Sequence, residues 1–207
     1  MGLREKNKEN TRLAILESAR RLLVERGYQG TPMEDVAADA GVSVGTLYNY
    51  FASKQALLAG VLEEEGKAMV AAGERILAVP SVDSRQGVKS ILKIYADDLL
   101  GIPKDLLREF ISFALSDSSQ TSETMGLDRA LLGQLERLFA ILGGERVLSA
   151  KVSQADAAFV VYSILFGVLL TFVSDPGMKV EDAKKRLIGQ VDIVFDGLGP
   201  TISNKEK

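Results

Sequence analysis

Apolar residues recur three and four positions apart along most of the chain, and this spacing predicts amphipathic helices. No stretch alternates between apolar and polar residues for long enough to predict a strand. Glycine and proline fall between the periodic segments, where they end one helix and allow a turn before the next. The pattern therefore predicts an all-α fold of about nine helices.

The predicted helices begin with a long one, continue with two short ones, and are longer again from residue 54 onwards. Thr31-Pro32-Met33-Glu34 matches a capping box with proline at the first helical position, and Gly41 supplies the left-handed turn that ends this helix. Ser43 is predicted to cap the next helix, and Ser53 the one after it. The predicted helices cover about residues 8–26, 32–40, 44–50, 54–78, 84–100, 103–116, 122–142, 153–173 and 180–198.

Two short helices joined by a tight glycine turn, after a longer supporting helix, predict a helix-turn-helix. A helical wheel divides the second short helix, which follows Ser43, into two faces. The inward face is predicted to consist of Val44, Leu47, Tyr48 and Phe51, and the outward face of Gly45, Thr46, Asn49 and Tyr50.

The outward face has the chemistry that a DNA major groove requires. Gly45 allows a close approach of the backbone, Thr46 can contact a base edge, and Asn49 can form two hydrogen bonds with an adenine. Val44 can contact a thymine methyl group. Another group of residues near helix starts carries hydroxyls and an amine that suit phosphate oxygens: Thr31, Ser43, Tyr48, Tyr50 and Lys54. The alternative is that these residues are ordinary helix caps, core residues and a surface lysine.

The spacing of these residues resembles the DNA-binding domain of the TetR family of bacterial regulators. The resemblance runs from Arg12 to Leu58 without a gap, and Val36 stands where the family often has isoleucine. It implies that the phosphate-contacting set above and the base-reading positions 44, 45, 46 and 49 have those roles here. It also implies a homodimer on a pseudo-palindromic operator, and a repressor released by a small molecule. The matching motif reads Arg12-x-x-Ile15-Leu16-x-x-Ala19, Gly27-Tyr28-x-x-Thr31 and Val36-Ala37-x-x-Ala40-Gly41-Val42-Ser43-x-Gly45-Thr46-Leu47-Tyr48-x-Tyr50-Phe51-x-x-Lys54-x-x-Leu57-Leu58.

The sequence divides into residues 1–53, the predicted helix-turn-helix DNA-binding domain, and residues 54–207, the predicted ligand-binding and dimerisation domain. The last two helices are the candidates for a dimer interface, because one is apolar nearly all round and the other has a continuous apolar stripe. Burial of this stripe inside a monomer is the alternative. The predicted interface residues are Val180, Leu187, Ile188, Val191, Val194 and Phe195.

Aromatic residues on the helices of the second domain are candidates for a ligand pocket. An apolar cavity with few polar groups would select a hydrophobic or amphipathic effector, whereas the alternative is that these residues belong to the core. Polar contacts would come from Ser112, Ser116, Gln134 or Ser163. The predicted pocket residues are Tyr95, Phe110, Phe113, Phe139, Tyr162 and Phe166.

Composition excludes several kinds of chemistry. The chain has no Cys, His or Trp, so it has no disulfide, no Ser-His-Asp triad and no Cys/His zinc site. No catalytic residue, metal or cofactor is therefore expected. The net charge is −3, and residues 1–54 hold eight Lys/Arg against seven Asp/Glu, so the DNA-binding prediction depends on geometry and not on a basic surface.

The polar first residues contain no signal peptide, so a cytoplasmic protein is expected. The apolar run at residues 157–173 is marginal for a membrane span, and the sequence favours a buried or interface helix there. Three alternatives remain open. They are a helical adaptor that binds only protein, a ligand-independent regulator or activator, and an enzyme based on carboxylates alone.

Overall fold

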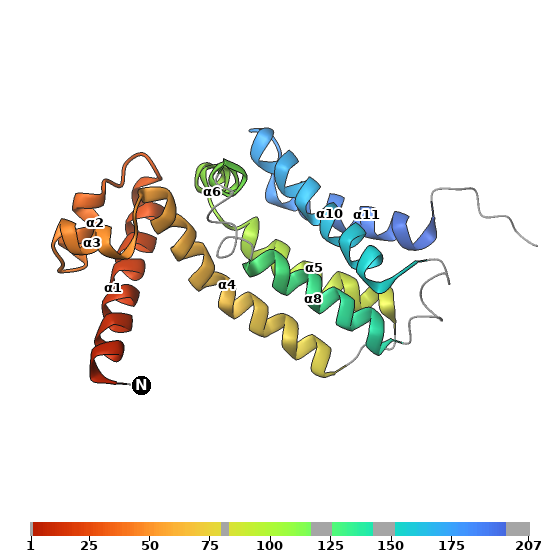
Figure 1. The fold of residues 1–207 in the computed structure, drawn as a ribbon. Coiled ribbons are helices and arrows are strands. Elements are labelled where there is room, and N and C mark those ends of the chain that lie inside the picture. Colours follow the sequence, from red (N-terminus) through yellow and green to blue (C-terminus); the bar gives the residue numbers. More distant parts are fainter. Residues whose placement is uncertain (1, 80–82, 117–125, 143–151, 198–207) are drawn as a thin grey trace, which may run out of the picture.

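A computed structural model describes residues 2–79, 83–116, 126–142 and 152–197. Within these ranges the chain forms nine helices and no strand, which confirms the all-α prediction. The first three helices form a small head at one end of the molecule, and the later helices form a larger layered body (Figure 1). Helix α4 runs from the head along the body and connects the two.

The head is built from α1 (Leu3–Arg26), α2 (Met33–Asp39) and α3 (Val44–Tyr50). Helix α1 begins earlier than residue 8, where the sequence pattern placed its start, because polar residues without an apolar stripe continue the helix beyond the core. The Glu5 carboxylate accepts a hydrogen bond of 2.9 Å from the Gly2 amide at this end. The head core includes Ile15, Ala19, Val36 and Leu47, each completely buried.

The predicted capping box at Thr31 is wrong, whereas the predicted caps at Ser43 and Ser53 are confirmed. The N-cap of α2 is Pro32, and Thr31 makes no capping bond to this helix. The Ser43 hydroxyl accepts a hydrogen bond of 3.0 Å from the Thr46 amide, and Ser53 caps α4 through the Ala56 amide. The tight turn between α2 and α3 contains Gly41 with a φ of +68°.

Helix α4 (Lys54–Ala78) belongs to two hydrophobic cores. Its first turns contribute Leu57, Leu58 and Val61 to the core of the head, and Met69 and Leu77 lie in the core of the body. The proposed domain boundary between residues 53 and 54 therefore coincides with the start of a helix that the head shares.

Two glycines let neighbouring side chains approach the backbone of α4 closely. A Cβ at Gly60 would lie 2.7 Å from the Phe51 ring, and one at Gly73 would overlap the Gln134 side chain. The first contact fixes α4 against the head, and the second fixes it against the body.

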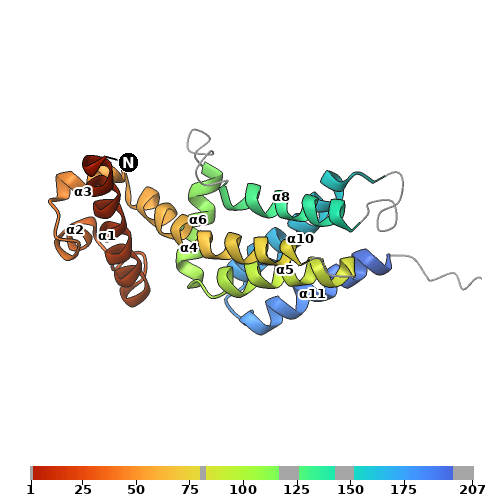
Figure 2. The same cartoon turned by 90° about the horizontal axis from the view of Figure 1, so that it is seen from below.

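The body arranges its helices in layers (Figures 1 and 2). Helices α5 and α8 lie between α4 and the pair formed by α10 and α11, and α6 runs across the direction of α4. Helix α10 is the one described helix that is long and apolar enough to cross a membrane, and it packs against α8 and α11. The bounds of the body helices are α5 (Ser84–Leu99), α6 (Lys104–Ser116), α8 (Gly126–Ile141), α10 (Gln154–Ser174) and α11 (Val180–Asp196).

A buried polar network fixes the contact between α4, α5 and α8. The Gln134 side chain is completely buried, and its amide nitrogen donates to the Val70 carbonyl (2.8 Å) and to a carboxylate oxygen of Glu74 (3.0 Å). Its amide oxygen accepts a hydrogen bond of 2.9 Å from the Tyr95 hydroxyl. Arg137 also pairs with the Glu74 carboxylate. Because every partner is satisfied, the network holds one register of α4 against α8.

We expect Tyr95→Phe to lower the free energy of unfolding by about 1–3 kcal/mol, because it leaves the buried Gln134 amide oxygen without its donor. Urea denaturation followed by circular dichroism measures this change. Tyr48→Phe is the matched control, since the Tyr48 side chain is 47% exposed, and it should leave stability unchanged. Equal stability of the two variants would contradict the importance of the network.

Candidate DNA-binding surface and ligand cavity

Helix α3 presents a continuous exposed face on the outside of the head. Leu47 packs α3 into the core of the head and is completely buried. Phe51, directly after the helix, is only 6% exposed. Val44, Gly45 and Asn49 are exposed, and Thr46 is half-buried. The predicted base-reading residues are therefore neighbours on one helix, and the opposite face of this helix is packed in the core of the head.

Three positions on α3 differ from the helical-wheel prediction. Tyr48, predicted to face inward, is exposed, and Tyr50, predicted to face outward, is half-buried against the head core. Val44 is also more exposed than the wheel predicted, at 37%. The reason is that the contact face is centred between Leu47 and Phe51, so that it extends towards Tyr50. The wheel had centred this face too far towards Tyr48.

The residues expected to contact phosphate differ in accessibility. Ser43 is exposed, and its hydroxyl lies 2.8 Å from that of Thr46. The Thr31 side chain is 2% exposed, and its hydroxyl donates to the carbonyls of Leu22 (3.1 Å) and Gly27 (2.9 Å). A buried hydroxyl that already donates inside the head has no proton to offer to a phosphate, so the structure removes Thr31 from this group.

Lys54 lies partly against the protein. Its ammonium stands 4.4 Å from the centre of the Tyr28 ring, a cation–π distance. Burial lowers the pKa of Lys54, and the nearby Glu109 carboxylate opposes this effect. Lys54 thus sits at the start of α4 with its charge held over an aromatic ring.

Ion pairs within the head neutralise much of its positive charge. Arg26 pairs with Asp35 at 2.7 Å, and Arg21 pairs with Asp39, which lowers the pKa of that carboxyl group. Arg20 pairs with Glu17, and Arg12 lies within 4 Å of acids on α4. Among the described residues of the head, the cations outside ion pairs are Arg4, Lys6, Lys8 and Lys54.

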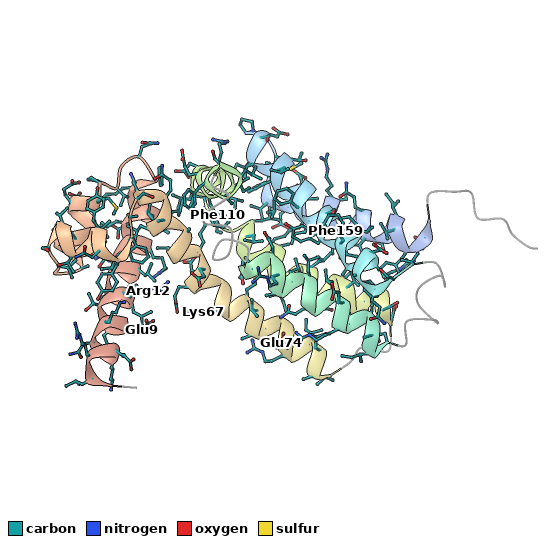
Figure 3. All side chains as sticks on the ribbon, in the orientation of Figure 1. Glu9, Arg12, Lys67, Glu74, Phe110 and Phe159 are labelled. Carbon is teal, nitrogen blue, oxygen red and sulfur yellow. The ribbon has the colours of Figure 1, made fainter. Side chains whose placement is uncertain are left out.

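A cavity of about 820 Å³ lies where α4, α5, α6 and α8 meet. Its walls are largely aliphatic, and its rim carries Arg20 from α1 of the head together with Glu65 and Asp98. Surrounding protein atoms shield the Glu65 carboxyl group and raise its pKa; Asp98 adds to this shift and Arg20 opposes it. Two lining residues, Lys67 on α4 and Phe110 on α6, are labelled in Figure 3. The apolar lining consists mainly of Leu62, Met69, Leu99, Ile102, Phe110 and Leu127.

Of the six aromatic residues predicted to line a pocket, all of which are described, Phe110 alone lines this cavity. Tyr95 and Phe139 are completely or almost completely buried in the body core. Tyr162 and Phe166 stack along α10 with ring centres 6.1 Å apart. Phe113 is half-buried on α6. The cavity was missed because its walls are aliphatic, and sequence alone does not distinguish these walls from core.

The predicted polar contacts also lie elsewhere. Gln134 belongs to the buried network, and the Ser163 hydroxyl donates to the Phe159 carbonyl one turn earlier on α10. Ser112 is exposed on α6, and the side chain of Ser116 lies outside the described residues. The polar rim of the cavity comes instead from charged residues of α1, α4 and α5.

The predicted interface stripe on α11 is split between two faces. Leu187 and Val191 are almost completely buried inside the subunit, where α11 packs on α10 and α5. Val180, Ile188 and Phe195 are half-buried, and Val194 is 45% exposed. The apolar stripe therefore combines residues that pack in the core of the subunit with residues that face outward, because α11 carries apolar side chains on both faces.

An exposed apolar surface lies beside this stripe, on α10 and α11. Phe159 is 59% exposed and Ile193 48%, although both are large apolar side chains. Phe159 is labelled on α10 in Figure 3. The signal available in the sequence was that the helix at residues 153–173 is apolar nearly all round, so that one buried face cannot account for all of its apolar residues. A shallow groove across this surface, which we call the α10–α11 groove, is lined by Phe159, Val160, Ser163, Ile164, Gln190, Ile193 and Val194.

Comparisons with known proteins agree with this architecture. Residues 15–61 match the family model described as bacterial regulatory proteins, tetR family. The chain is 25% identical over 187 residues to the HTH-type transcriptional regulator PksA of Bacillus subtilis, an alignment that covers 88% of each protein.

Solved structures share the whole fold. FadR of Thermus thermophilus, a transcriptional repressor in complex with lauroyl-CoA, superimposes with a TM-score of 0.74 at 21% identity and covers 95% of this chain and 99% of its own. FadR of Bacillus subtilis, in complex with stearoyl-CoA, gives a TM-score of 0.68 at 16% identity over 90% of this chain and 99% of its own. The matched segment therefore identifies a tetR-family DNA-binding domain at residues 15–61, from within α1 into α4, and the solved structures show that the whole chain has the fold of TetR-family regulators.

Proposed function

We propose that this regulator is a homodimeric repressor that binds a pseudo-palindromic operator through α3 and leaves it when a hydrophobic or amphipathic ligand fills the cavity in the body. The proposal of DNA binding depends on one observation: α3 has an exposed face, while Leu47 on its opposite face is fully buried. Such a helix can enter a major groove without losing its own support. The protein works in the cytoplasm, where its operator is accessible.

We assign the base contacts to Val44, Gly45, Thr46 and Asn49, which lie on or beside the exposed face. Ser43, Tyr48 and Lys54 are the proposed phosphate contacts, and half-buried Tyr50 supports them from the edge of the core. Because the head holds few unpaired cations, each phosphate contact supplies little affinity by itself. Two heads acting on one duplex compensate for this weakness, since they read half-sites about 34–36 Å apart.

The α10–α11 groove is the proposed dimer interface. Its exposed phenylalanine and branched aliphatic residues are costly in water and become favourable when a second copy covers them. Val194 and Ile193 from α11 and Phe159 from α10 form its centre. Of the interface residues predicted from the sequence, Val194 lines this groove.

The cavity beside α4 is the proposed effector site. Its volume falls within the usual range of ligand pockets, and its aliphatic walls suit an acyl chain. The two FadR proteins of the same fold are in complex with lauroyl-CoA and stearoyl-CoA, which supports a long-chain ligand here. Release of DNA requires only that the ligand prefer a position of α4 in which the two heads no longer match the operator.

We expect Asn49→Ala to weaken binding to the preferred operator by about 1–3 kcal/mol and to relax the sequence preference at one base pair. The dependence of affinity on salt should stay the same, because no phosphate contact is lost. Fluorescence anisotropy at several salt concentrations measures both quantities. Gln154→Ala, an exposed amide on the body, is the control. An unchanged preference in Asn49→Ala would remove this residue from the reading face.

Val194→Glu is expected to convert the dimer to a monomer, because it places a charge within an apolar contact without a partner. Sedimentation velocity measures the change. Val79→Glu is the matched control, since Val79 is 77% exposed at the end of α4, and it should remain a dimer. A Val194→Glu protein that sediments as a dimer would show that another surface joins the two copies.

Ala130→Phe should fill the cavity and weaken ligand binding by about tenfold or more, which corresponds to at least 1.4 kcal/mol. Isothermal titration calorimetry with lauroyl-CoA and with dodecanoate separates the contribution of the acyl chain from that of the CoA group. Ala140→Phe, on the exposed side of the same helix, should bind as the unmodified protein does. If neither probe binds the unmodified protein, the proposal of a long-chain effector is wrong.

A further inference from the structure

Helix α6 occupies a position between the head and the helices of the proposed dimer interface. It packs against α4 and against α10, and Figure 1 shows it nearly end-on above the junction of head and body. Successive residues in its first turn point to different parts of the molecule. Leu107 is buried in the body core, and Leu106 is buried in the core of the head.

One side of α6 holds the turn between α10 and α11. The Lys104 ammonium donates to the carbonyls of Asp175 (2.7 Å) and Met178 (2.7 Å), and more weakly to that of Pro176 (3.4 Å). It also stands 4.3 Å from the centre of the Phe172 ring. A single charged group therefore gathers three carbonyl oxygens of this turn.

Arg108, one turn later on α6, extends this attachment. Its guanidinium donates a hydrogen bond of 2.6 Å to the Val173 carbonyl near the end of α10. The last carbonyls of a helix lack partners within that helix and carry its negative dipole end. Arg108 thus satisfies a carbonyl in the last turn of α10, and Lys104 satisfies that of Asp175, the residue that caps the helix.

The other side of α6 holds the head. The Asp105 carboxylate accepts a hydrogen bond of 3.4 Å from the Tyr28 amide, in the loop that follows α1. A Cβ at Gly27 would lie only 3.1 Å from the same carboxylate oxygen, so the loop after α1 and the first turn of α6 are in close contact. Leu106, 3% exposed, adds an apolar side chain to the core of the head.

These contacts give the head a second attachment to the body. Helix α4 alone would leave the orientation of the head to the bending of one long helix. Helix α6 meets the head at a different place, and its Lys104 and Arg108 hold the turn after α10 and the last turn of α10. The first half of the same helix lines the α10–α11 groove. The angle of the head relative to the proposed interface is thus defined by two separate supports.

We propose that Lys104 is a positioning residue: by holding the α10–α11 turn against the first turn of α6, it sets the spacing of half-sites that the dimer accepts. The inference rests on the proposed function, because spacing has meaning only for two heads on one duplex. The rival role is a purely structural cap on α10, which would affect stability and not spacing.

The test begins with duplexes that the unmodified protein enriches from a random pool. Affinity is then measured by fluorescence anisotropy for the selected spacing, for spacings changed by one or two base pairs, and for a single half-site. Lys104→Met removes the donors. Asp105→Asn weakens the contact between α6 and the head. The double variant tests whether Lys104 and Asp105 act through the same helix, α6. Lys93→Met is the control, since Lys93 is an exposed lysine on α5 that pairs with Asp97.

Lys104→Met should lower affinity for the selected spacing by about tenfold and flatten the preference among spacings, while single half-site affinity stays unchanged. Asp105→Asn should act in the same direction, and the double variant should lose less than the product of the two effects. Lys104→Arg keeps the charge and the donors, and should restore the preference. Lys93→Met should behave as the unmodified protein does.

The outcomes separate the inference from the function on which it rests. Failure of the unmodified protein to enrich any duplex would refute the proposed function, and the inference with it. Selection of spaced half-sites, with an unchanged spacing preference in Lys104→Met, would refute the inference alone. Equal losses on the single half-site and the full site would also refute it, because they indicate a structural cap. If Lys104→Met does not fold, Asp105→Asn decides by the same criteria.

Discussion

The structure depends on the burial of one continuous helix in two hydrophobic cores. Leu57 and Leu58 at the start of α4 complete the head, and Met69 and Leu77 further along it belong to the body. A head of this size buries too little apolar surface to be stable by itself, so this shared helix supplies part of its core. The same sharing means that any displacement of α4 within the body must also move the head.

Recognition by this head must depend on shape more than on charge. Ion pairs such as Arg26–Asp35 join α1 to α2, and they use cations that a basic DNA-binding domain would offer to phosphates. Exposed pairs of this kind add little stability, but they reduce the positive charge of the head, and α3 itself carries no charged residue. In the proposed dimer, specificity would then depend on how accurately the two heads are held, and therefore on the contacts of α4 and α6.

The cavity and the buried polar network lie next to each other along α4. Val70 lines the cavity, and its carbonyl accepts a hydrogen bond from Gln134. One wall of the cavity therefore belongs to the helix that the polar network fixes. On the other side, Arg20 brings the head to the rim. In the proposed function, a ligand bound in this space would contact α4 directly, so no further element would be needed to connect the ligand with the head.

The sequence by itself determined the helices, the helix-turn-helix and the caps at Ser43 and Ser53, because periodicity, glycine turns and capping act over a few residues. The tertiary structure decided which apolar side chains face the core, a cavity or the exterior. Thr31 carries no local sign of its burial, and the apolar pattern around Tyr95 and Leu187 does not say whether the core, a pocket or a second copy covers them. The aliphatic walls around Leu62 and Leu127 look like core in a linear pattern. The roles of Gln134 and Lys104 arise only from contacts between segments distant in the chain, and those contacts exist only after the helices have packed.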